Sequence, residues 1–489
     1  MRPVLPLFLA LFLGAAPGAD DAAETEEQMR RFAELYAVVE EHAADPVIPA
    51  VAIHGGAIPG MLKRLDPYSV FFDPDQFQQL QELQESTRKG FGSVVSVLPG
   101  RVFVLQTLPG TPSAHAGMMP GDEILAINGI RLDRLTFEQL LELLNFARQR
   151  PVKLDVRRPG AARLLQVEMR PETLESPSVD LAYFIRAGVG YVRATSFESD
   201  TGQQIRDAIG KLGGHHLKAL VLDLRDNPGG VMTAALETAA CFLEPGQTIV
   251  SVRGRSTETE QIKVPADAKP FRFPLAVLIN DRSASGSEIV AGALQDHDRA
   301  VIIGTESFGK GLVQGVYPLS GGAGLALTTA YYYTPSGRSI QRPLTAGQLE
   351  SARHTGGAND YRTDAGRPAP GGGGIQPDHT VYPEPVTPLM MVLEASGVFP
   401  AFAAETLREQ GPVEEGFEVG SALLDQFQAY LADRRIQPGV ERWSATREWI
   451  RSRLRQEIYN QAFGIAQGDA VQLERDPQVR KALEVLDDR

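Results

Sequence analysis

Cysteine is almost absent from this chain of 489 residues, whose one cysteine, Cys241, lies in the apolar stretch ETAACFL well inside the sequence. A single thiol excludes an internal disulfide, and its position excludes the N-terminal lipid attachment of a lipoprotein. A catalytic thiol is one alternative, but a lone cysteine among apolar residues is typical of a small core residue. The fold therefore depends on apolar cores, and a chain this long needs several.

Blocks of basic residues and long apolar runs are also missing. The 48 lysines and arginines stand against 61 acidic residues, a formal charge of −13, so nucleic acid is not expected as a partner. The N-terminal stretch MRPVLPLFLALFLGAAPGA is short for a membrane span of about 20 apolar residues. Its arginine, apolar run and small residues predict a signal peptide over residues 1–19, although Pro17 disturbs the cleavage pattern before Ala19.

A signal peptide implies export to the periplasm or the extracellular space. No stable membrane span is then expected after the signal is cleaved. A retained N-terminal membrane anchor is the alternative interpretation of the same residues.

The hydrophobic pattern divides the rest of the chain into four regions. Apolar residues at helical spacing predict a helical region over residues 24–88, and strand patterns with turn signals follow over residues 89–171. Residues 172–385 repeat strand, glycine turn, helix and strand, which predicts an α/β core with a parallel sheet. Within this core, the glycine-rich segment 343–376 is expected to be a mobile loop. Residues 386–489 return to helical spacing.

A turn rich in serine and glycine carries the candidate chemistry. Residues 275–314 read as a buried strand, a turn with three serines, a helix from about Ser285, a second buried strand and the motif Gly-Lys-Gly centred on Lys310. A second turn, residues 225–230, ends another apolar strand. Ligands of parallel sheets gather at the carboxyl ends of the strands, so both turns are candidates for one site. A serine at a helix start is also a common N-cap, which is the alternative without catalysis.

A serine hydroxyl becomes an effective nucleophile when a base removes its proton during attack. No histidine has the local arrangement of a Ser–His–Asp triad, and His297 lies several turns along the helix from Ser285, although neighbours in space are not visible in a sequence. Lys310 is the other candidate base. Apolar neighbours would enclose its amine, and desolvation favours the neutral form that accepts a proton. These neighbours are Ile302, Ile303, Phe308, Leu312 and Val313.

The negative charge that develops on an attacked amide needs hydrogen-bond donors. Backbone N–H groups at a helix start are unpaired and lie at the positive end of the helix dipole. Gly286, directly after Ser285, offers one such group, and Gly229 or Gly230 at the start of another helix offers a second. Glycine suits both places because the backbone itself must approach the substrate.

The strand region contains G-F-G and then A-G-x-x-P-G-D-E-I-L-x-I-N-G. These motifs resemble a PDZ domain over about residues 90–170. The resemblance implies that a glycine-rich loop donates N–H groups to the terminal carboxylate of a peptide, which adds as a strand beside a helix. The loop would be Gly90, Phe91, Gly92 and Ser93, and the groove would be lined by Leu140, Leu141 and Leu144. The alternative is a PDZ-like packing module with an empty groove.

The segment around Ser285 reads S-A-S-G-S-E-I-x-A-G-A-L-Q-D, with F-G-K-G-x-V-Q after it and D-L-R-x-N-P-G-G before it. Together with L-D-P-Y-S at residues 65–69, these motifs resemble the C-terminal processing, or tail-specific, proteases over about residues 35–382. That family joins a helical N-terminal part, a PDZ domain and a crotonase- or ClpP-like α/β core. We therefore expect an α/β multidomain fold with helical N- and C-terminal regions.

The same resemblance implies roles for single residues. They are the nucleophile Ser285, the general base Lys310, the orienting residue Gln314, and the oxyanion donors Gly286 and Gly230 or Gly229. The family often has alanine or serine where Gly286 stands, so this turn is expected to be more flexible, with an effect on rate and not on reaction class. Glu288 and Asp296 also lie in the motif and are interpreted as structural or orienting residues. No metal and no organic cofactor is implied.

The expected function is that of an exported serine endopeptidase that cleaves proteins near their C-termini through a Ser–Lys dyad and an acyl-enzyme. Its PDZ domain would recognise the tails of protein or peptide substrates or gate the site, and a second copy of the chain or an adaptor protein is a further candidate partner. A non-catalytic periplasmic scaffold that binds protein C-termini is the alternative, and it would lack the serine or the lysine. Acyl-CoA chemistry on a crotonase-like core fits a signal peptide poorly, because CoA substrates are cytoplasmic.

Overall fold

The computed structural model describes residues 19–86, 89–108, 110–158, 161, 163–174, 177–255, 259–343 and 361–488. Residues 1–18 of the predicted signal peptide and residues 344–360 of the predicted mobile loop lie outside these ranges. Within them, no single helix is long and apolar enough to cross a membrane. One bent pair, α10 (Pro388–Ala395) with α11 (Val398–Gln410), reaches that length and composition only when the two helices are taken together.

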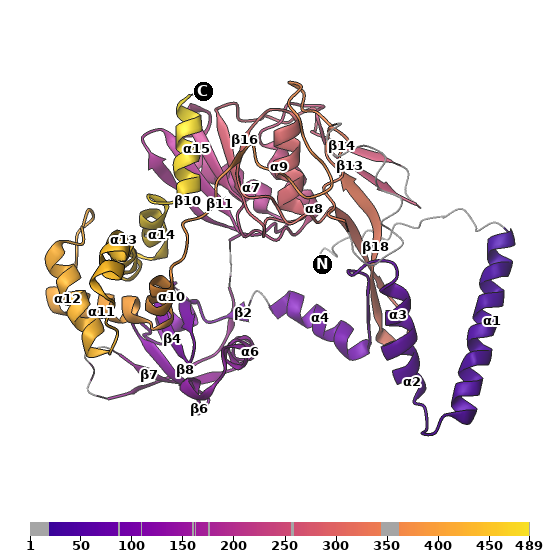
Figure 1. Ribbon diagram of the computed structural model, residues 1–489, viewed down its shortest axis with the longest axis horizontal. Helices are drawn as coiled ribbons and strands as arrows, with labels where there is room; N and C mark the ends of the chain where they lie inside the picture. The colour runs from indigo at the N-terminus through magenta and orange to yellow at the C-terminus, as the bar shows by residue number, and fades with distance from the viewer. Residues whose placement is uncertain are drawn as a thin grey trace, which may run out of the picture.

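A six-stranded sheet forms the centre of the α/β core (Figure 1). The strand order is β10-β11-β12-β15-β16-β19, and all neighbours are parallel except β10 and β11. The strands are β10 (Val179–Arg186), β11 (Val189–Ala194), β12 (Ala219–Asp223), β15 (Leu275–Ile279), β16 (Val301–Gly304) and β19 (His379–Thr380). The predicted parallel sheet is therefore present, with one antiparallel edge.

Helices cover both faces of this sheet. Along β12, Leu220 and Leu222 face the layer of α7, α8 and α9, whereas Val221 faces the layer of α15. Successive side chains of a strand point to opposite faces, so a strand buried on both faces is apolar throughout. The helices are α7 (Thr201–Lys211), α8 (Met232–Ala240), α9 (Gly286–Asp296) and α15 (Pro477–Asp487). The C-terminal helix α15 thus covers the second face of the core.

A second, antiparallel sheet connects the N-terminal region to the core. Its order is β1-β18-β13-β14, and β17 pairs with β18. Its strands are β1 (Val70–Phe72), β13 (Thr248–Gly254), β14 (Glu260–Lys263), β17 (Leu312–Pro318) and β18 (Gly324–Tyr333). The N-terminal helices are α1 (Ala19–His42), α2 (Pro49–Ala52), a π-helical turn (Ile53–Ala57), α3 (Ile58–Leu62) and α4 (Pro74–Ser86), and α1 stands apart from the body in Figure 1.

The PDZ region is a separate sheet with its own core. The order is β3-β4-β5-β7-β8, with β6 beside β5, so β3 is an edge strand. Thr136 and Gln139 form a capping box at the start of α6. The elements are β2 (Lys89–Gly90), β3 (Ser93–Leu98), β4 (Arg101–Thr107), α5 (Pro112–His115), β5 (Glu123–Ile127), β6 (Ile130–Arg131), α6 (Phe137–Ala147), β7 (Val152–Arg157), β8 (Leu165–Met169) and β9 (Glu172–Thr173), the last of which pairs with β2.

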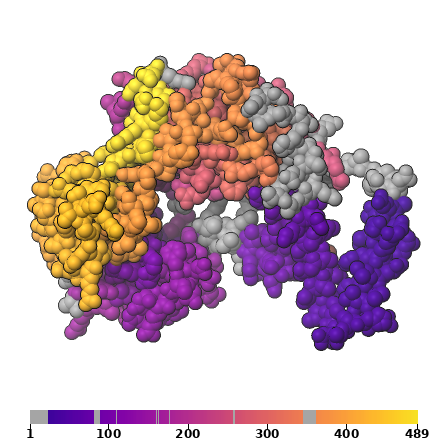
Figure 2. Space-filling view, in the orientation of Figure 1, coloured from indigo at the N-terminus to yellow at the C-terminus, as the bar shows by residue number. Residues whose placement is uncertain are grey.

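The C-terminal helices join the PDZ region to the α/β core (Figures 1 and 2). Arg101 of the PDZ sheet donates from Nη1 to the carbonyl oxygen of Ser396 at 2.9 Å, and Gln106 accepts the N–H of Ile465 at 3.0 Å. On the core side, Arg193 pairs with Asp469 at 2.9 Å. These helices are α10, α11, α12 (Ser421–Asp433), α13 (Val440–Phe463), α14 (Ile465–Leu473) and α15.

The described part of the glycine-rich segment packs against the α/β core. Ile375 is fully buried, and its N–H donates to the Ser307 hydroxyl at 2.6 Å. The N–H of Gly374 donates to the carbonyl oxygen of Ile340 at 2.9 Å. The expectation of a mobile loop therefore does not hold for residues 361–376, where buried side chains and backbone hydrogen bonds outweigh the glycine content.

Candidate active site

Ser285 occupies a strained turn between β15 and α9. It is the N-cap residue of α9, with φ 53° and ψ −109°. A residue with a side chain adopts such a conformation at a cost of about 1–3 kcal/mol, and strain of this kind concentrates at functional sites. The turn is anchored by Ser283, whose hydroxyl donates to the carbonyl oxygen of Leu224 at 2.8 Å and accepts the N–H of Asn280 at 2.9 Å. The Ser283 hydroxyl is thus used in hydrogen bonds that hold the turn, whereas Ser285 is the residue with the strained backbone conformation.

The glycine turn after β12 lies against Ser285. A Cβ atom on Gly229 would stand 2.8 Å from the Cβ atom of Ser285, and a Cβ atom on Gly230 would stand 2.2 Å from the carbonyl oxygen of Phe197. Both positions therefore require glycine. The N–H of Gly229 donates to Oδ1 of Asn227 at 2.9 Å. Among the described residues, none accepts a hydrogen bond from the N–H of Gly230 or Gly286, so the geometry favours this pair as oxyanion donors.

Glycine at position 286 has a packing reason. A Cβ atom there would stand 3.0 Å from Cδ2 of Phe197 and 3.2 Å from the Cβ atom of Ala235. The Phe197 ring is fully buried and has little room to move. The ring therefore occupies the space that the alanine or serine of other sequences would need.

Lys310 lies in the loop between β16 and β17 and points toward Gln314. Its Nζ donates to Oε1 of Gln314 at 3.1 Å and lies 5.5 Å from the centre of the Tyr68 ring. Gln314 in turn donates from Nε2 to the carbonyl oxygen of Tyr68 at 2.9 Å. The structure therefore brings the predicted base and its predicted orienting residue into contact.

The apolar enclosure expected for Lys310 is wrong for three of its five members, Ile302, Ile303 and Phe308. Ile302 and Ile303 lie in β16 and face the two cores on opposite sides of the sheet, and Phe308 is 43% exposed. The half-buried lysine instead lies beside Tyr68, which comes from the N-terminal region. A central parallel strand buries its apolar side chains in the sheet's own layers, so they do not reach the loop that follows.

Tyr68 is a site residue that the sequence analysis did not identify. Asp66, which is 1% exposed, accepts the N–H groups of Tyr68 and Ser69 at 2.7 and 2.8 Å and the Ser69 hydroxyl at 2.7 Å. Burial, and then the carboxylates of Asp66 and Glu288, raise the pKa of the Tyr68 hydroxyl. The L-D-P-Y-S motif was the available signal, because its turn delivers Tyr68 to Gln314.

Glu288 joins the loop of the serine to the loop of the lysine. Its Oε2 accepts the N–H of Ser285 and the N–H of Lys310, each at 2.9 Å. Its Oε1 accepts the Ser307 hydroxyl at 2.5 Å and the N–H of Gly309 at 2.7 Å. The side chain is fully buried, and burial raises the pKa of the Glu288 carboxyl although the four donors act in the opposite direction. One carboxyl group therefore sets the separation of the two loops.

Other titratable candidates lie away from this site. His297 is at the far end of α9, where Nδ1 meets Asp364 at 2.7 Å and Nε2 meets the carbonyl oxygen of Thr248 at 2.8 Å. Asp296 forms a buried ion pair with Arg338 at 2.8 Å. Within the described ranges, no group of three or more His, Cys, Asp or Glu side chains is arranged to hold a metal ion.

The PDZ region contains an apolar cavity of about 500 Å³ between β3 and α6. Six of the seven residues predicted to bind a peptide line it: they are Gly90, Phe91, Gly92, Ser93, Leu141 and Leu144. Leu140 does not, because it is fully buried in the PDZ core. Neighbouring positions on a helix point about 100° apart, so Leu141 faces the cavity as predicted, whereas the inclusion of Leu140 was wrong.

Two family models match the chain. They are Peptidase family S41 over residues 188–347, which include both candidate loops and the glycine turn, and a PDZ domain over residues 103–158.

Similar curated proteins are carboxyl-terminal processing proteases. That of Bartonella bacilliformis is 38% identical over 291 residues, which cover 58% of this chain and 66% of that protein. That of Synechocystis is 33% identical over 292 residues, with coverage of 58% and 68%. That of Bacillus subtilis is 31% identical over 288 residues, with coverage of 59% and 61%. The chain therefore spans about two thirds of the length of these relatives. A solved structure, the photosystem II D1 C-terminal processing protease, is 25% identical with a TM-score of 0.41, covering 71% of this chain and 86% of that one.

Proposed function

Because the chain belongs to peptidase family S41, among the carboxyl-terminal processing proteases, we propose that it is a serine endopeptidase that cleaves proteins near their C-termini. The observation that carries the proposal is the shared carboxylate of Glu288, whose one oxygen accepts the N–H groups of both Ser285 and Lys310. A nucleophile and a base on separate loops must be held at a constant separation to react, and this carboxylate supplies the link.

In the proposed mechanism, Ser285 attacks the carbonyl carbon of the scissile amide. The amine of Lys310 accepts the hydroxyl proton as the Oγ–carbon bond forms, and it returns a proton to the leaving amine. Gln314 accepts a hydrogen bond from Nζ and so directs the amine. Water then attacks the acyl-enzyme with the same lysine as the base, which releases the shortened protein and restores Ser285.

The oxyanion of each tetrahedral intermediate would be bound by the N–H groups of Gly286 and Gly230. The first lies at the start of α9, where the helix dipole adds positive potential. The second comes from the neighbouring turn, which the bond from Gly229 to Asn227 keeps in shape. Donors placed before the reaction need no reorganisation, which is why such pairs stabilise transition states strongly.

The proposed substrates are proteins with exposed, apolar C-terminal tails. The chain would be incubated with a folded protein that carries such a tail, once with a free carboxylate and once with the tail amidated, and the products would be measured by intact mass. We expect cuts near the C-terminus, slower cleavage of the amidated tail, and no effect of a metal chelator. Equal cleavage of both tails would contradict tail recognition, and no cleavage of either would favour the non-catalytic scaffold that binds protein tails.

The cavity between β3 and α6 is the proposed binding groove for the tail. An extended peptide would pair with the free edge of β3 and place an apolar side chain beside Leu141 and Leu144. Leu144→Glu is expected to weaken binding of an apolar C-terminal peptide about tenfold or more, because tenfold corresponds to only about 1.4 kcal/mol of lost apolar contact. Fluorescence anisotropy with a labelled peptide measures this change.

The matched control is Phe146→Glu, which makes the same kind of change on the exposed side of the same helix. Peptide affinity should stay within twofold of the unmodified protein in this variant. If Leu144→Glu also leaves the affinity unchanged, the groove is not the tail site.

The location of the enzyme is a further part of the proposal. The pattern of residues 1–19 supports export to the periplasm or the extracellular space, with the signal removed. N-terminal sequencing of the protein recovered outside the cytoplasm measures the cleavage position. A start at Met1 in that fraction would contradict a cleaved signal.

A further inference from the structure

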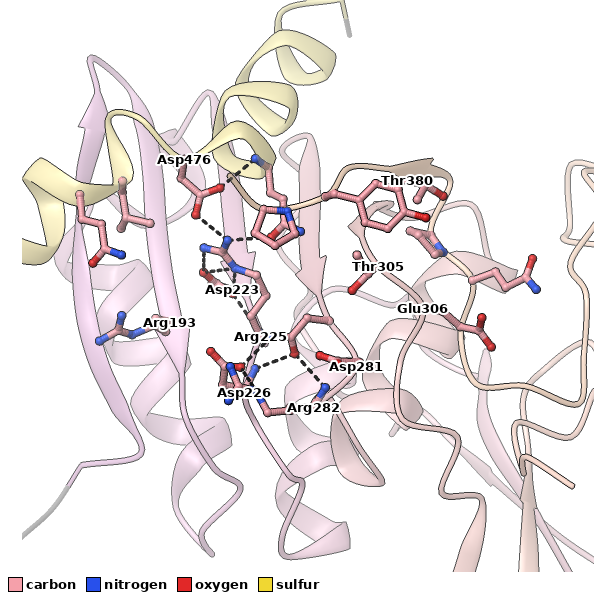
Figure 3. A pocket seen from close by; sticks show the side chains of 18 of the residues that line it. Arg193, Asp223, Arg225, Asp226, Asp281, Arg282, Thr305, Glu306, Thr380 and Asp476 are labelled. Atoms are coloured by element: carbon pink, nitrogen blue, oxygen red, sulfur yellow. Dashed lines mark hydrogen bonds and ion pairs between the residues drawn. The ribbon is translucent and has the colours of Figure 1, made fainter. Parts of the chain in front are cut away.

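Arg225 lies just after β12 and is held from two sides (Figure 3). Inside the α/β core, its Nη2 donates to Oδ2 of Asp223 at 2.6 Å. From the C-terminal region, Oδ2 of Asp476 accepts a hydrogen bond from Nη1 at 2.5 Å, and Oε1 of Gln478 accepts another at 2.8 Å. The Arg225 side chain is 15% exposed and that of Asp223 1%, so water and salt screen these ion pairs weakly.

The residues after Arg225 form the turn that ends with the oxyanion donor Gly230. Asp226 has a left-handed φ of 61°, and its N–H donates to Oδ1 of Asn280 at 2.9 Å. The carbonyl oxygen of Asn227 accepts the N–H of Ala284 at 3.0 Å. These later contacts come from the core. Within the described part of the chain, the hydrogen bonds from the C-terminal region to this turn all end on Arg225.

Packing alone does not hold the outer side of the turn. A cavity of about 950 Å³ lies beside Arg225, Asp226 and Asp476, so few protein atoms press on the turn from that side. Asn227 and Gly229 are buried, but Asp226 is exposed and has an unusual backbone conformation, which relaxes unless specific bonds restrain this part of the turn. The ion pair to Asp476 is such a restraint.

Asp476 is itself placed with little freedom. It is the N-cap residue of α15, and its Oδ1 accepts the N–H groups of Gln478 and Val479 at 2.8 and 3.2 Å. Because Oδ1 accepts these two bonds at the start of the helix, Oδ2 is directed toward Arg225. The helix is fixed in turn by its apolar face, including Val479 and Leu486, which packs on the central sheet.

We propose that Asp476 is a positioning residue for the oxyanion hole, and that the C-terminal helix α15 acts on catalysis through it. The ion pair with Arg225 holds the start of the turn, and the turn holds the N–H of Gly230 toward the reacting carbonyl. The inference rests on the proposed function. It adds that Asp476, about 190 positions after the nucleophile, affects the stability of the transition state without touching the substrate.

The test uses Asp476→Ser in the full chain. Serine keeps the capacity to cap α15 but does not reach Arg225, so the helix is preserved while the ion pair is lost. Asp476→Asn is the second variant, since its carbonyl oxygen still caps and its amide offers no charge. Asp487→Asn is the matched control, because it removes an exposed ion pair with Arg186 from the same helix.

For both Asp476 variants, kcat on a tail-bearing substrate should fall about tenfold to a hundredfold, less than the loss of a whole oxyanion donor, while KM stays within twofold. The affinity of a peptide aldehyde, which forms a tetrahedral adduct with the serine, should fall by a similar factor. The control should match the unmodified enzyme, and all four proteins should melt within a few degrees of one another.

Unchanged kcat and aldehyde affinity in both Asp476 variants would overturn the inference while leaving the protease intact. A loss of kcat that follows a loss of folded protein would overturn it as well, because the residue would then be only structural. If the unmodified chain does not cleave, the proposed function fails and the inference falls with it.

Discussion

Ser285→Ala is expected to lower the rate of tail cleavage at least about 10⁴-fold, to the level of residual binding effects, because no oxygen remains to form the acyl-enzyme. Labelling by a fluorophosphonate probe should disappear with it. The alanine keeps the side-chain volume small and leaves the bond from its own N–H to Glu288 in place. The folded structure and its melting temperature should therefore change little, and intact mass after labelling measures the loss directly.

The neighbouring serines are the controls for this assignment. Ser283 and Ser287 each donate a hydrogen bond to a backbone carbonyl oxygen, of Leu224 and Asn227 respectively. Their alanine variants should lose about 1 kcal/mol of stability each and still react with the probe at Ser285. Probe labelling that survives Ser285→Ala and vanishes in one of the others would move the nucleophile to that serine.

A glycine at position 285 distinguishes the effect of backbone strain on stability from the role of the serine hydroxyl in cleavage. Ser285→Gly should be as inactive as the alanine variant but more stable by up to about 1–3 kcal/mol, because glycine adopts a φ of 53° without steric strain. Thermal unfolding measures the difference. A glycine variant no more stable than the alanine variant would mean that the turn stores no strain.

Lys310→Cys is expected to lower the cleavage rate about 10²–10⁴-fold, the contribution typical of a positioned general base. Alkylation of the new thiol with 2-bromoethylamine restores an amine at nearly the length of the lysine, and activity should return with it. The native thiol does not interfere, because Cys241 is fully buried and burial raises its pKa to about 11. Cleavage measured before and after alkylation gives both results.

Lys263→Cys on the exposed end of β14 is the control for the lysine, and neither the substitution nor the alkylation should alter its rate. If alkylated Lys310→Cys stays inactive while its mass shows complete modification, Lys310 contributes something other than an amine base. Full activity of the unalkylated variant would remove Lys310 from the mechanism.

The local parts of the site could be predicted from the sequence because each is a strand followed by a turn. Ser285, Gly286 and Lys310 lie in short motifs next to apolar strands. The motifs identify these residues, and the hydrophobic pattern around them identifies the strands and the helix. Leu140 was wrongly included in the groove beside Leu141 because both are apolar, and α6 buries one face in the PDZ core while it exposes the next. Burial decides between them, and burial is a property of the packed structure.

The remote parts of the site could not be predicted in this way. Tyr68 meets Gln314 across 246 positions, and Arg225 meets Asp476 across 251. The L-D-P-Y-S motif marks Tyr68 by itself, but no periodic or local signal links Tyr68 to Gln314 or Arg225 to Asp476. Ile302 and Ile303 were wrongly placed around Lys310 for a related reason: a strand between two helix layers packs its side chains against both layers, so they do not reach the next loop.

The position of α15 has a consequence for how the protein is made. The ribosome releases β11, β12 and β15 long before it reaches residues 477–487, so one apolar face of the central sheet, including Val221, Ala276 and Leu278, stays uncovered during synthesis. Domains generally fold as units once their residues have emerged. This face of the core is therefore completed only after residues 477–487 have been made. The contact between Arg225 and Asp476 likewise forms only after residue 476 has emerged, so the restraint proposed for the glycine turn is absent while β12 and its turn are first made.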